Sequence, residues 1–564
     1  MKTLPSQLLF FFQSKTTKRN LNTLWKFFIF LGLIICLYSA LFHGLMVYEG
    51  RDYSWITGFY WTMTVMSTLG FGDITFHSDL GLLFTMFVLV SGVLFLLIIL
   101  PFTFIQFFYA PWLEAQEKAR TPRAVPEEMQ GHVIITGIDP ISTRLIERLV
   151  KENIPYVIVT ADVQEANTLI DQGFSVVVGE PDLPSTYWNL NINSAALAIL
   201  NNDDMINTNL AFTIREANRT VPIVANATYA HSIDILEYTG NIHVFQFMKM
   251  LGESLSLRTI GVGMTSNIIG RFNELLISEM PALGTELVGK SLAQAGVRQA
   301  TGVTVIGLME EGKFLPSSPH TIITHKSILM LAGSASQIEA FDQKYLVKMD
   351  KVNDEIEVLI LGGGRVGNAA AETLAKSGVK YRIVEKRPIK TEGPDRENYI
   401  LGDAADINTL KAAGIEKAKS VIVTTHSDDM NIYLTFYCRQ LRSDIQIISR
   451  SILERNVAKL HMAGADLVMS YASLGAGKIY QLLQPDGISL FTEGLTVLRR
   501  KAGIDFAGKT IMNSGIREKT GCSIIAIKRH AQIIPSPSPD VELEENDELV
   551  VMGTTENEPL FLAL

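Results

Sequence analysis

The chain carries two long apolar stretches near its N-terminus, followed by short apolar runs that alternate with amphipathic segments. Residues 27–48 contain no Lys, Arg, Asp or Glu, and neither do residues 80–113. Each stretch is long enough to cross about 30 Å of hydrocarbon. We therefore expect two membrane-spanning helices, the second projecting beyond the bilayer. Between them, the aromatic-rich residues 55–67 predict a shorter helix.

Basic residues flank these stretches unequally. Arg51 stands nearly alone between the spans, whereas Lys15, Lys18, Arg19 and Lys26 precede the first span. Because basic residues accumulate on the cytoplasmic side, the segment 1–26 should be cytosolic, and two spans return the rest of the chain to the same side. We expect a multi-pass protein of the plasma (inner) membrane with both termini in the cytoplasm. No Arg-rich helix precedes the second span, so a voltage sensor is not expected.

A glycine-rich stretch follows the short helix. It reads Thr68, Leu69, Gly70, Phe71, Gly72 and Asp73. The two glycines can adopt the positive φ values that point successive backbone carbonyls in one direction. Four such segments around an axis would replace the water shell of a dehydrated cation. This pattern predicts an ion-selectivity filter.

The stretch resembles the potassium-channel signature TVGYGD, with Leu69 in place of Val and Phe71 in place of Tyr. The resemblance implies K⁺ selectivity. Phe71 lacks the hydroxyl that braces the filter from behind, so the bracing should be looser. The resemblance also makes Tyr60 and Trp61 an aromatic cuff toward which Asp73 would hydrogen-bond.

The second span contains candidates for a gate. Gly92 lies nineteen residues after Asp73, where the family has a hinge glycine, although simple helix packing is an alternative. Pro101 removes a helical hydrogen bond and should kink or loosen the helix. Leu97, with Ile98 beside it, is the candidate for a narrow hydrophobic ring; a lipid-facing Leu97 is the competing interpretation.

Residues 114–130 form a charged, proline-containing linker, after which the chain repeats itself at an interval of 219–225 residues. The matched landmarks are His132–Gly137 with Glu357–Gly362, Asp203–Met205 with Asp428–Met430, Gly240 with Gly464, Val288–Ser291 with Ala507–Thr510, Gly302 with Gly521, and Pro316 with Pro535. A period of this length indicates a duplicated domain rather than a solenoid.

Each unit begins with β-branched runs separated by helical patterns, which predicts a parallel doubly wound sheet, and ends in a smaller α+β lobe. In the second unit the predicted strands are 358–361, 381–384, 420–424 and 445–448. In the first unit the predicted N-lobe is 131–245, the crossover 246–278 and the C-lobe 279–350. In the second unit the N-lobe is 351–470, the crossover 471–496 and the C-lobe 497–564. The predicted fold class is multidomain: an all-α two-helix pore, residues 27–113, then two α/β Rossmann-like units.

A pore followed by two such units resembles the ligand-gated potassium channels with tandem RCK domains (regulator of K⁺ conductance), a domain shared with Trk and Ktr transport regulators. The resemblance covers almost the whole chain. It implies a homotetramer in the lipid bilayer, whose eight RCK units form a gating ring that pulls on the inner helices when ligands bind. It implies a channel and not an enzyme.

The second unit carries a dinucleotide-binding pattern. Gly362, Gly364 and Gly367 form G-x-G-x-x-G after a strand, and Glu385 follows eighteen residues later at the end of the next strand. The glycines admit the pyrophosphate and the acid binds ribose hydroxyls, which favours NAD or an adenine nucleotide such as ADP or ATP over NADP. The resemblance adds Arg365, Val366, Lys386, Asp403, Ala404, Asp428, Asn431 and Arg450 to the site. A fold that has lost its ligand is the alternative.

The first unit departs from this pattern. Asp139 stands where the second glycine should be, Pro140 lacks an N–H, and Thr160 replaces the ribose-binding acid. A carboxylate at that position would repel the pyrophosphate. We expect no dinucleotide here, only a structural role or a different ligand.

Composition narrows the function further. The formal charge of −9 argues against a nucleic-acid partner, and the widely spaced Cys36, Cys438 and Cys522 predict neither a disulfide framework nor a metal cluster. The acid-rich residues 540–547 are a candidate Ca²⁺ site, with a solvated surface as the alternative. A membrane-anchored NAD-dependent oxidoreductase and a non-selective cation pore are the competing functions.

Overall fold

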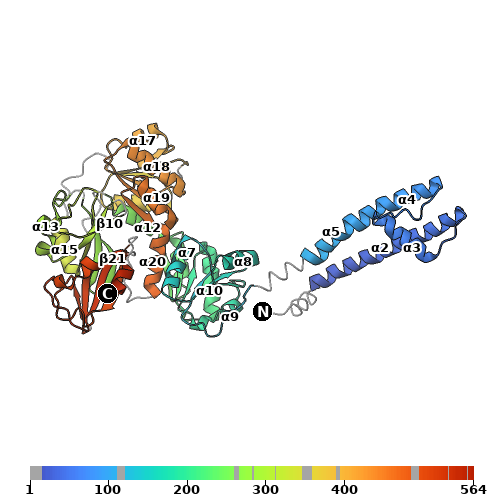
Figure 1. Cartoon of the computed structure of the whole chain (residues 1–564). Helices are drawn as coiled ribbons and strands as arrows, with labels where there is room; N and C mark the ends of the chain where they lie inside the picture. Colours follow the sequence, from blue (N-terminus) through green and yellow to red (C-terminus); the bar gives the residue numbers. More distant parts are fainter. Residues whose placement is uncertain are drawn as a thin grey trace. The chain divides into compact units, whose positions relative to one another are not determined.

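The computed structural model describes most of the chain (Figure 1). The described residues are 15–110, 121–259, 266–282, 285–310, 313–345, 358–388, 394–483, 495–530, 532–554 and 557–564. Parts of the predicted organisation lie outside the described residues: most of the N-terminal segment, the end of the inner helix at 113, the start of the linker, and the junction of the two units at 350.

The N-terminal part is helical. It contains α2 (Lys15–Tyr48), α3 (Trp55–Met66) and α4 (Asp79–Gly92). Ser54 and Ser78 cap α3 and α4, because each hydroxyl accepts a backbone N–H of the first turn. Two stretches, Leu24–Tyr48 and Asp79–Phe107, are long and apolar enough to cross a membrane, as predicted. Tyr38, Phe42 and Trp61 pack in the apolar core of this helical part.

The helix that begins at α4 continues through two π-helical segments. These are η1 (Val93–Ile99) and η2 (Ile105–Tyr109), with α5 (Leu100–Phe104) between them. The Leu100 N–H donates to the Phe95 carbonyl, five residues back. Pro101 sits at the start of α5 and contributes no N–H. The helix is therefore loosened around Pro101 and not broken there, which agrees with one of the two outcomes expected from the sequence.

The first regulatory unit begins with a six-stranded sheet in the order β3-β2-β1-β4-β5-β6. Its strands are β1 (Val133–Ile135), β2 (Tyr156–Thr160), β3 (Val176–Val178), β4 (Leu197–Leu200), β5 (Ile223–Asn226) and β6 (Ile242–Phe245). Its helices are α7 (Pro140–Lys151), α8 (Val163–Asp171), α9 (Pro184–Asn189), α10 (Asp204–Ala217), α11 (His231–Glu237) and α12 (Phe247–Ser256). The strand order reverses at β1, where ligands of such sheets bind.

The second unit repeats this sheet in the order β14-β13-β12-β15-β16-β17. Its strands are β12 (Val358–Leu361), β13 (Tyr381–Glu385), β14 (Tyr399–Leu401), β15 (Ser420–Val423), β16 (Gln446–Ser451) and β17 (Leu467–Ser470). Its helices are α16 (Arg365–Lys376), α17 (Ile407–Ala413), α18 (Asp428–Leu441), α19 (Val457–Met462) and α20 (Tyr471–Leu483). The four predicted strands are confirmed. Their ends agree with the prediction to within one residue, except that β16 continues to Ser451, three residues past the predicted end.

Each unit ends in a lobe with an antiparallel sheet. The first contains β7 (Asn267–Phe272), β8 (Leu275–Pro281), β9 (Thr304–Glu310), β10 (Lys313–Pro316) and β11 (Ile328–Gly333), with α13 (Leu292–Ala295), α14 (Val297–Thr301) and α15 (Ala335–Tyr345). The second contains β18 (Leu495–Lys501), β19 (Ser523–Arg529), β20 (Gln532–Pro535) and β21 (Glu548–Thr554), with α21 (Ile516–Thr520) and α22 (Glu558–Leu562). Ile306 and Met330 of the first lobe share one core with Ile525 and Met552 of the second.

The sheet of the first lobe includes residues before 279, the predicted start of that lobe. Strand β7 and the start of β8 precede that residue, and both belong to the lobe's sheet through the β7–β8 and β8–β11 pairings. The division between crossover and lobe at 278/279 stays a prediction.

The two crossover helices are exchanged between the units. Helix α12 of the first unit packs along α16 of the second, and α20 of the second packs along α7 of the first; Figure 1 shows the second of these pairs. The contacts are close: a Cβ on Gly252 would lie 2.3 Å from the Val366 carbonyl oxygen, and one on Gly475 would lie 2.4 Å from the Ile141 side chain. Each sheet is thus covered near its first helix by an element of the other unit.

Equivalent hydrogen bonds in the two units correct one of the residue matches between the repeats. Asp204 accepts the N–H groups of Thr228 and Tyr229, and Asp428 accepts those of Ile452 and Leu453. Asp204 therefore corresponds to Asp428, one residue away from the match drawn from the sequence, which paired Asp203 with Asp428. The second unit has one extra residue in the preceding loop, His426, and this insertion shifts the register.

Candidate functional site

The segment after α3 has an alternating backbone. Thr68, Gly70 and Gly72 have φ values of 63°, 46° and 73°, whereas Leu69 and Phe71 between them do not lie in this region. The N–H groups of Leu69 and Gly70 donate to the Thr64 carbonyl at 2.9 and 3.2 Å. These donors point back toward α3, so carbonyls of the segment can face away from it. This is the geometry that the filter prediction requires.

The aromatic cuff makes the predicted contact with Asp73. The Tyr60 hydroxyl donates to Asp73 Oδ2 at 3.1 Å, and Trp61 Nε1 donates to the Ile74 carbonyl at 3.1 Å. The Phe71 ring stacks parallel to that of Tyr60, with centroids 6.5 Å apart. Phe71 therefore lies alongside the cuff through its ring and lacks the hydroxyl that Tyr would add.

The candidate gate residues lie along the loosened inner helix. Gly92 is buried, and a Cβ there would lie 2.3 Å from the Met66 Cα at the end of α3. Close packing against α3 thus accounts for this glycine, and a hinge role stays a prediction. Leu97 and Ile98 are 47% and 57% exposed in the single chain, so both present apolar surface for lipid, for a pore or for another copy.

The Gly-rich turn of the second sheet connects β12 to α16. Gly362 has φ 112°, which favours glycine, and a Cβ on Gly367 would lie 1.9 Å from the Gly362 carbonyl oxygen. Gly364 is the N-cap of α16 and carries no side chain to satisfy the first N–H groups of the helix. Unsatisfied N–H groups and the helix dipole make such a terminus suited to a phosphate.

Glu385 lies beside this turn at the end of β13. Its carboxylate accepts the Gly363 N–H at 2.7 Å and the Arg387 N–H at 3.0 Å. Lys386 forms an ion pair with Asp403 at 2.8 Å, and this hydrogen bond lowers the pKa of Asp403. The acids predicted for ribose and adenosine therefore lie at the expected edge of the sheet, already held by main-chain donors and one lysine.

His426 lies beside the turn, and the charges of three arginines act on it. Arg450 is 3% exposed; its Nε donates to the Thr425 carbonyl at 2.8 Å, and burial lowers its pKa to about 10. Partial burial, followed by the charges of Arg450, Arg387 and Arg365, lowers the pKa of His426. Such a concentration of positive charge is suited to an anionic ligand.

Sequence reasoning missed His426 and Arg387. Arg387 directly follows Lys386 after the strand, which was a usable signal, whereas His426 is a loop insertion that only the repeat alignment reveals.

Other predicted residues make contacts that stabilise the loops around the turn. Asp428 accepts the N–H groups of Ile452 and Leu453, and Asn431 bonds to the Thr425 N–H and the Arg450 carbonyl. Val366 is 2% exposed in the sheet–helix core, and Ala404 packs against a core cluster. These four residues fix the loops that carry the charged groups.

The first unit has a different environment at the equivalent turn. Asp139 caps α7, because its Oδ1 accepts the Ser142 N–H at 2.7 Å and the Ser142 hydroxyl at 2.9 Å. Pro140 stands at the position of Arg365, and Asn226 at that of Arg450. The helix terminus is already satisfied by a carboxylate, and two of the cations are replaced by uncharged residues.

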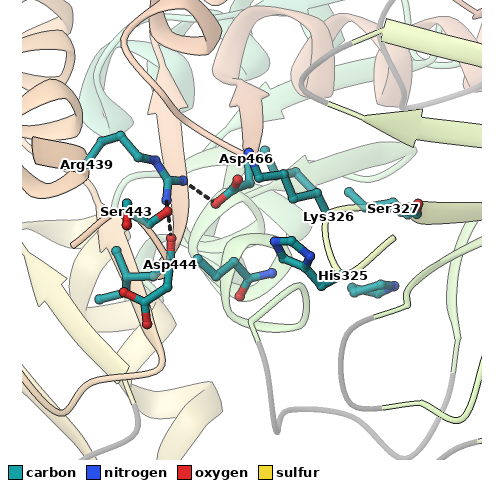
Figure 2. Close-up of a pocket in the computed structure, with 12 residues that line it drawn as sticks. His325, Lys326, Ser327, Arg439, Ser443, Asp444 and Asp466 are labelled. Carbon is teal, nitrogen blue, oxygen red and sulfur yellow. Dashed lines mark hydrogen bonds and ion pairs between the residues drawn. The ribbon is translucent and has the colours of Figure 1, made fainter. Parts of the chain in front are cut away.

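A small pocket lies where a loop of the first C-lobe meets the second sheet (Figure 2). Arg439 donates to Asp466 at 2.7 Å on one side, and His325, Lys326 and Ser327 line the other. Its volume of about 30 Å³ suits a water molecule and not a nucleotide. The crevice at Gly362–Gly367 is therefore the stronger nucleotide candidate.

Comparisons with known proteins agree with this architecture. An ion-channel family model matches residues 25–109, TrkA-N domain models match 133–246 and 358–471, and TrkA-C domain models match 278–345 and 497–564. Potassium channel protein 1 of Methanocaldococcus jannaschii is 30% identical over 236 residues, covering 39% of this chain and 71% of that protein. Ktr system potassium uptake protein A of Bacillus subtilis is 25% identical over 202 residues, covering 34% of this chain and 90% of that protein.

A solved structure extends the similarity over nearly the full length. The structure of the GsuK channel bound to NAD is 38% identical and covers 97% of this chain and 99% of that one, with a TM-score of 0.58. With its ion-channel segment and two TrkA-type units, this chain belongs to the family of potassium channels that carry tandem RCK regulatory domains.

Proposed function

We propose that four copies of this chain form one K⁺-selective pore, with Thr68–Asp73 as its filter. The alternation of positive φ at Thr68, Gly70 and Gly72 carries this proposal, because it lets carbonyls line one side of the segment. Leu97 or Ile98 would form the closing ring below it. Reversal potentials in planar bilayers, with K⁺ replaced by Na⁺ on one side, test selectivity. A reversal potential that does not move would favour the non-selective alternative.

The eight regulatory units are proposed to form a ring on the cytoplasmic side. Equivalent helices of the two units expose equivalent apolar residues: Ile206 and Phe212 on α10 are 47% and 55% exposed, and Met430 and Phe436 on α18 are 40% and 53% exposed. Because the same positions are apolar in both units, these helices are suited to pack against equivalent helices of other units. Light scattering on the purified channel should give the mass of a tetramer.

We further propose that the second unit binds an adenine dinucleotide, NAD, or a related adenine nucleotide. The observation that carries this is the contrast between α16 and α7. Helix α16 has no side-chain cap and begins beside His426, on which the charges of three arginines act, whereas Asp139 caps α7. The solved relative bound to NAD supports a nucleotide ligand for this chain, without assigning it to a unit. Glu385 should disfavour the 2′-phosphate of NADP.

Calorimetry on the purified channel tests the nucleotide proposal. One NAD per chain is expected, with weaker binding of NADP. Two NAD per chain would place a dinucleotide in the first unit as well and contradict the assignment. Binding changes channel opening only by the difference in affinity between open and closed states, so bilayer recordings with and without NAD give that difference directly.

We propose a regulatory and not a catalytic use of the nucleotide. The relatives named above are potassium channels and potassium uptake proteins, which gives the oxidoreductase alternative no support. The Ca²⁺ alternative at residues 540–547 is also weakened, because Arg529 donates to Asp547 at 2.7 and 2.8 Å and contacts Glu544 at 2.8 Å. Among the described residues, no group of three or more His, Cys, Asp or Glu is placed to hold a metal ion.

A further inference from the structure

The chain between the proposed filter and the inner helix is irregular. This return segment, residues 74–78, follows Asp73 directly and ends at Ser78, the N-cap of α4. It forms neither helix nor strand. Its path is therefore set by contacts with the rest of the helical part, and those contacts come from two places in the chain.

The first set of contacts holds the start and the middle of the return segment. The Ile74 carbonyl accepts the indole N–H of Trp61 on α3. Phe76 is 3% exposed, and its ring packs against those of Phe42 and Trp61 with centroids 5.6 and 5.3 Å apart. A Cβ on Gly81 would lie 2.5 Å from Phe76, so this glycine leaves the room that the ring needs. The segment is thus anchored in the apolar core by one ring.

The second set of contacts comes from the turn that follows α2. Arg51 Nη1 donates to the Thr75 carbonyl at 2.7 Å. The Glu49 carboxylate accepts the Ser78 N–H at 2.8 Å, the Ser78 hydroxyl at 2.6 Å and the His77 N–H at 3.1 Å. Arg51 Nη1 also lies 3.8 Å from Glu49 Oε2. Two charged side chains, one of each sign, therefore hold the return segment on both sides of Phe76.

Glu49 is suited to this position because it is a carboxylate there. Its side chain is 8% exposed, and hydrogen bonds, first of all from the Ser78 hydroxyl, lower its pKa. Hydrogen bonds to an ionised acceptor are stronger than those between neutral groups, and three donors converge on this one. The Ser78 hydroxyl donates to Glu49 and accepts the Gly81 N–H at 3.2 Å. The same contact therefore links the end of α2 to the first turn of α4.

We propose that Glu49 and Arg51 are positioning residues for ion conduction, which hold the return segment and thereby keep the filter in its conducting shape. The start of the filter is fixed by the bonds from Leu69 and Gly70 to the Thr64 carbonyl. Its other end has no such bond beyond the contact of Asp73 with the cuff, so its position depends on the chain that follows. The inference rests on the proposed filter function of residues 68–73, to which neither Glu49 nor Arg51 belongs.

Sustained recordings of the full-length channel in planar bilayers test the inference. Glu49→Gln keeps the size of the side chain and turns one acceptor oxygen into an amide donor that faces other donors. Losing one hydrogen bond to a charged group should shift the equilibrium between conducting and non-conducting filters about tenfold or more toward the non-conducting form. The K⁺ current should therefore decline during the recording. Arg51→Gln, which removes the contact with the Thr75 carbonyl, should show the same decline.

The dependence on K⁺ concentration locates the change at the filter. K⁺ binds the conducting filter, whose carbonyls line one side, and stabilises it by mass action. High K⁺ on both sides should therefore slow the decline in Glu49→Gln and in Arg51→Gln. A decline that does not respond to K⁺ in either variant would place the change at the gate and overturn the inference.

The matched control is Asp52→Asn. Asp52 lies in the same loop and is exposed, and its side chain forms no hydrogen bond or ion pair with the described residues. This variant removes the same negative charge as Glu49→Gln, and its current should hold as in the wild type. An equal decline in Asp52→Asn would assign the effect to charge near the pore and contradict the positioning role.

Failure of the inference can be told apart from failure of the proposed filter. A steady current in both Glu49→Gln and Arg51→Gln, with wild-type selectivity for K⁺ over Na⁺, overturns the positioning role and leaves the filter standing. If the wild-type channel does not select K⁺ over Na⁺, the filter proposal itself fails and the inference falls with it. If Glu49→Gln does not assemble, the recording of Arg51→Gln decides.

Discussion

Replacing Gly364 with Asp should convert the second unit's turn into a copy of the first unit's. Gly364 has φ −76° and ψ −171°, an extended conformation that any residue adopts. A Cβ there would lie 3.3 Å from the His426 ring, whose side chain can move. The variant should therefore fold. Its carboxylate can accept an N–H in the first turn of α16, as Asp139 does with Ser142.

The substitution should stabilise the ligand-free protein and weaken nucleotide binding. A new N-cap contributes about 1 kcal/mol to the helix, so the ligand-free protein should unfold at a slightly higher temperature. Binding loses a hydrogen bond to a charged phosphate, about 1.5–3 kcal/mol, and gains a repulsion of about 1 kcal/mol between like charges near 4 Å in water. The total of roughly 2.5 kcal/mol or more corresponds to about 60-fold weaker nucleotide binding.

Calorimetry with NAD and ADP, together with thermal unfolding of the ligand-free channel, measures both effects. The matched control is Asp139→Gly, which removes the cap of α7, should lower stability by about 0.5–2 kcal/mol, and should create no new site because Pro140 and Asn226 remain. Wild-type affinity in Gly364→Asp would refute the reasoning, since it would mean that the phosphates do not lie at the start of α16.

Three further predictions concern the pore and the pH dependence of binding. Gly70→Ala forces a residue with a Cβ to φ 46°, at a cost of about 1–2 kcal/mol per chain, and should abolish K⁺-over-Na⁺ selectivity; full selectivity would move the filter elsewhere. Leu97→Asp should place like charges around the closed gate and raise the basal open probability in bilayers. If the open probability is unchanged in both Leu97→Asp and Ile98→Asp, the gate lies near Phe104 or at the filter. The pKa of His426 is lowered in the ligand-free protein, and phosphates favour the protonated ring, so binding takes up a proton and NAD affinity should rise from pH 8 to pH 6. A slope that persists in His426→Gln would assign that proton to another group.

Local patterns determined much of this protein. The two apolar stretches specify helices long enough for a bilayer, and β-branched runs after the linker specify the strands of two parallel sheets. Gly362, Gly364 and Gly367 mark the turn, because their spacing reflects backbone requirements within six residues. The prediction that the first unit holds no dinucleotide also rests on local chemistry, since Asp139 caps its own helix.

Tertiary structure alone decided which distant residues meet. Arg450 and His426 converge on the turn because β15 and β16 end at the same edge of the sheet, and a one-residue insertion sets the position of His426. Gly92 owes its close approach to Met66 to the packing of the inner helix on α3, which no local pattern encodes. The exchange of α12 and α20 between the units brings Gly252 against Val366 and Gly475 against Ile141. Such contacts depend on how whole elements pack, and the periodicity of a single segment carries no record of its partner.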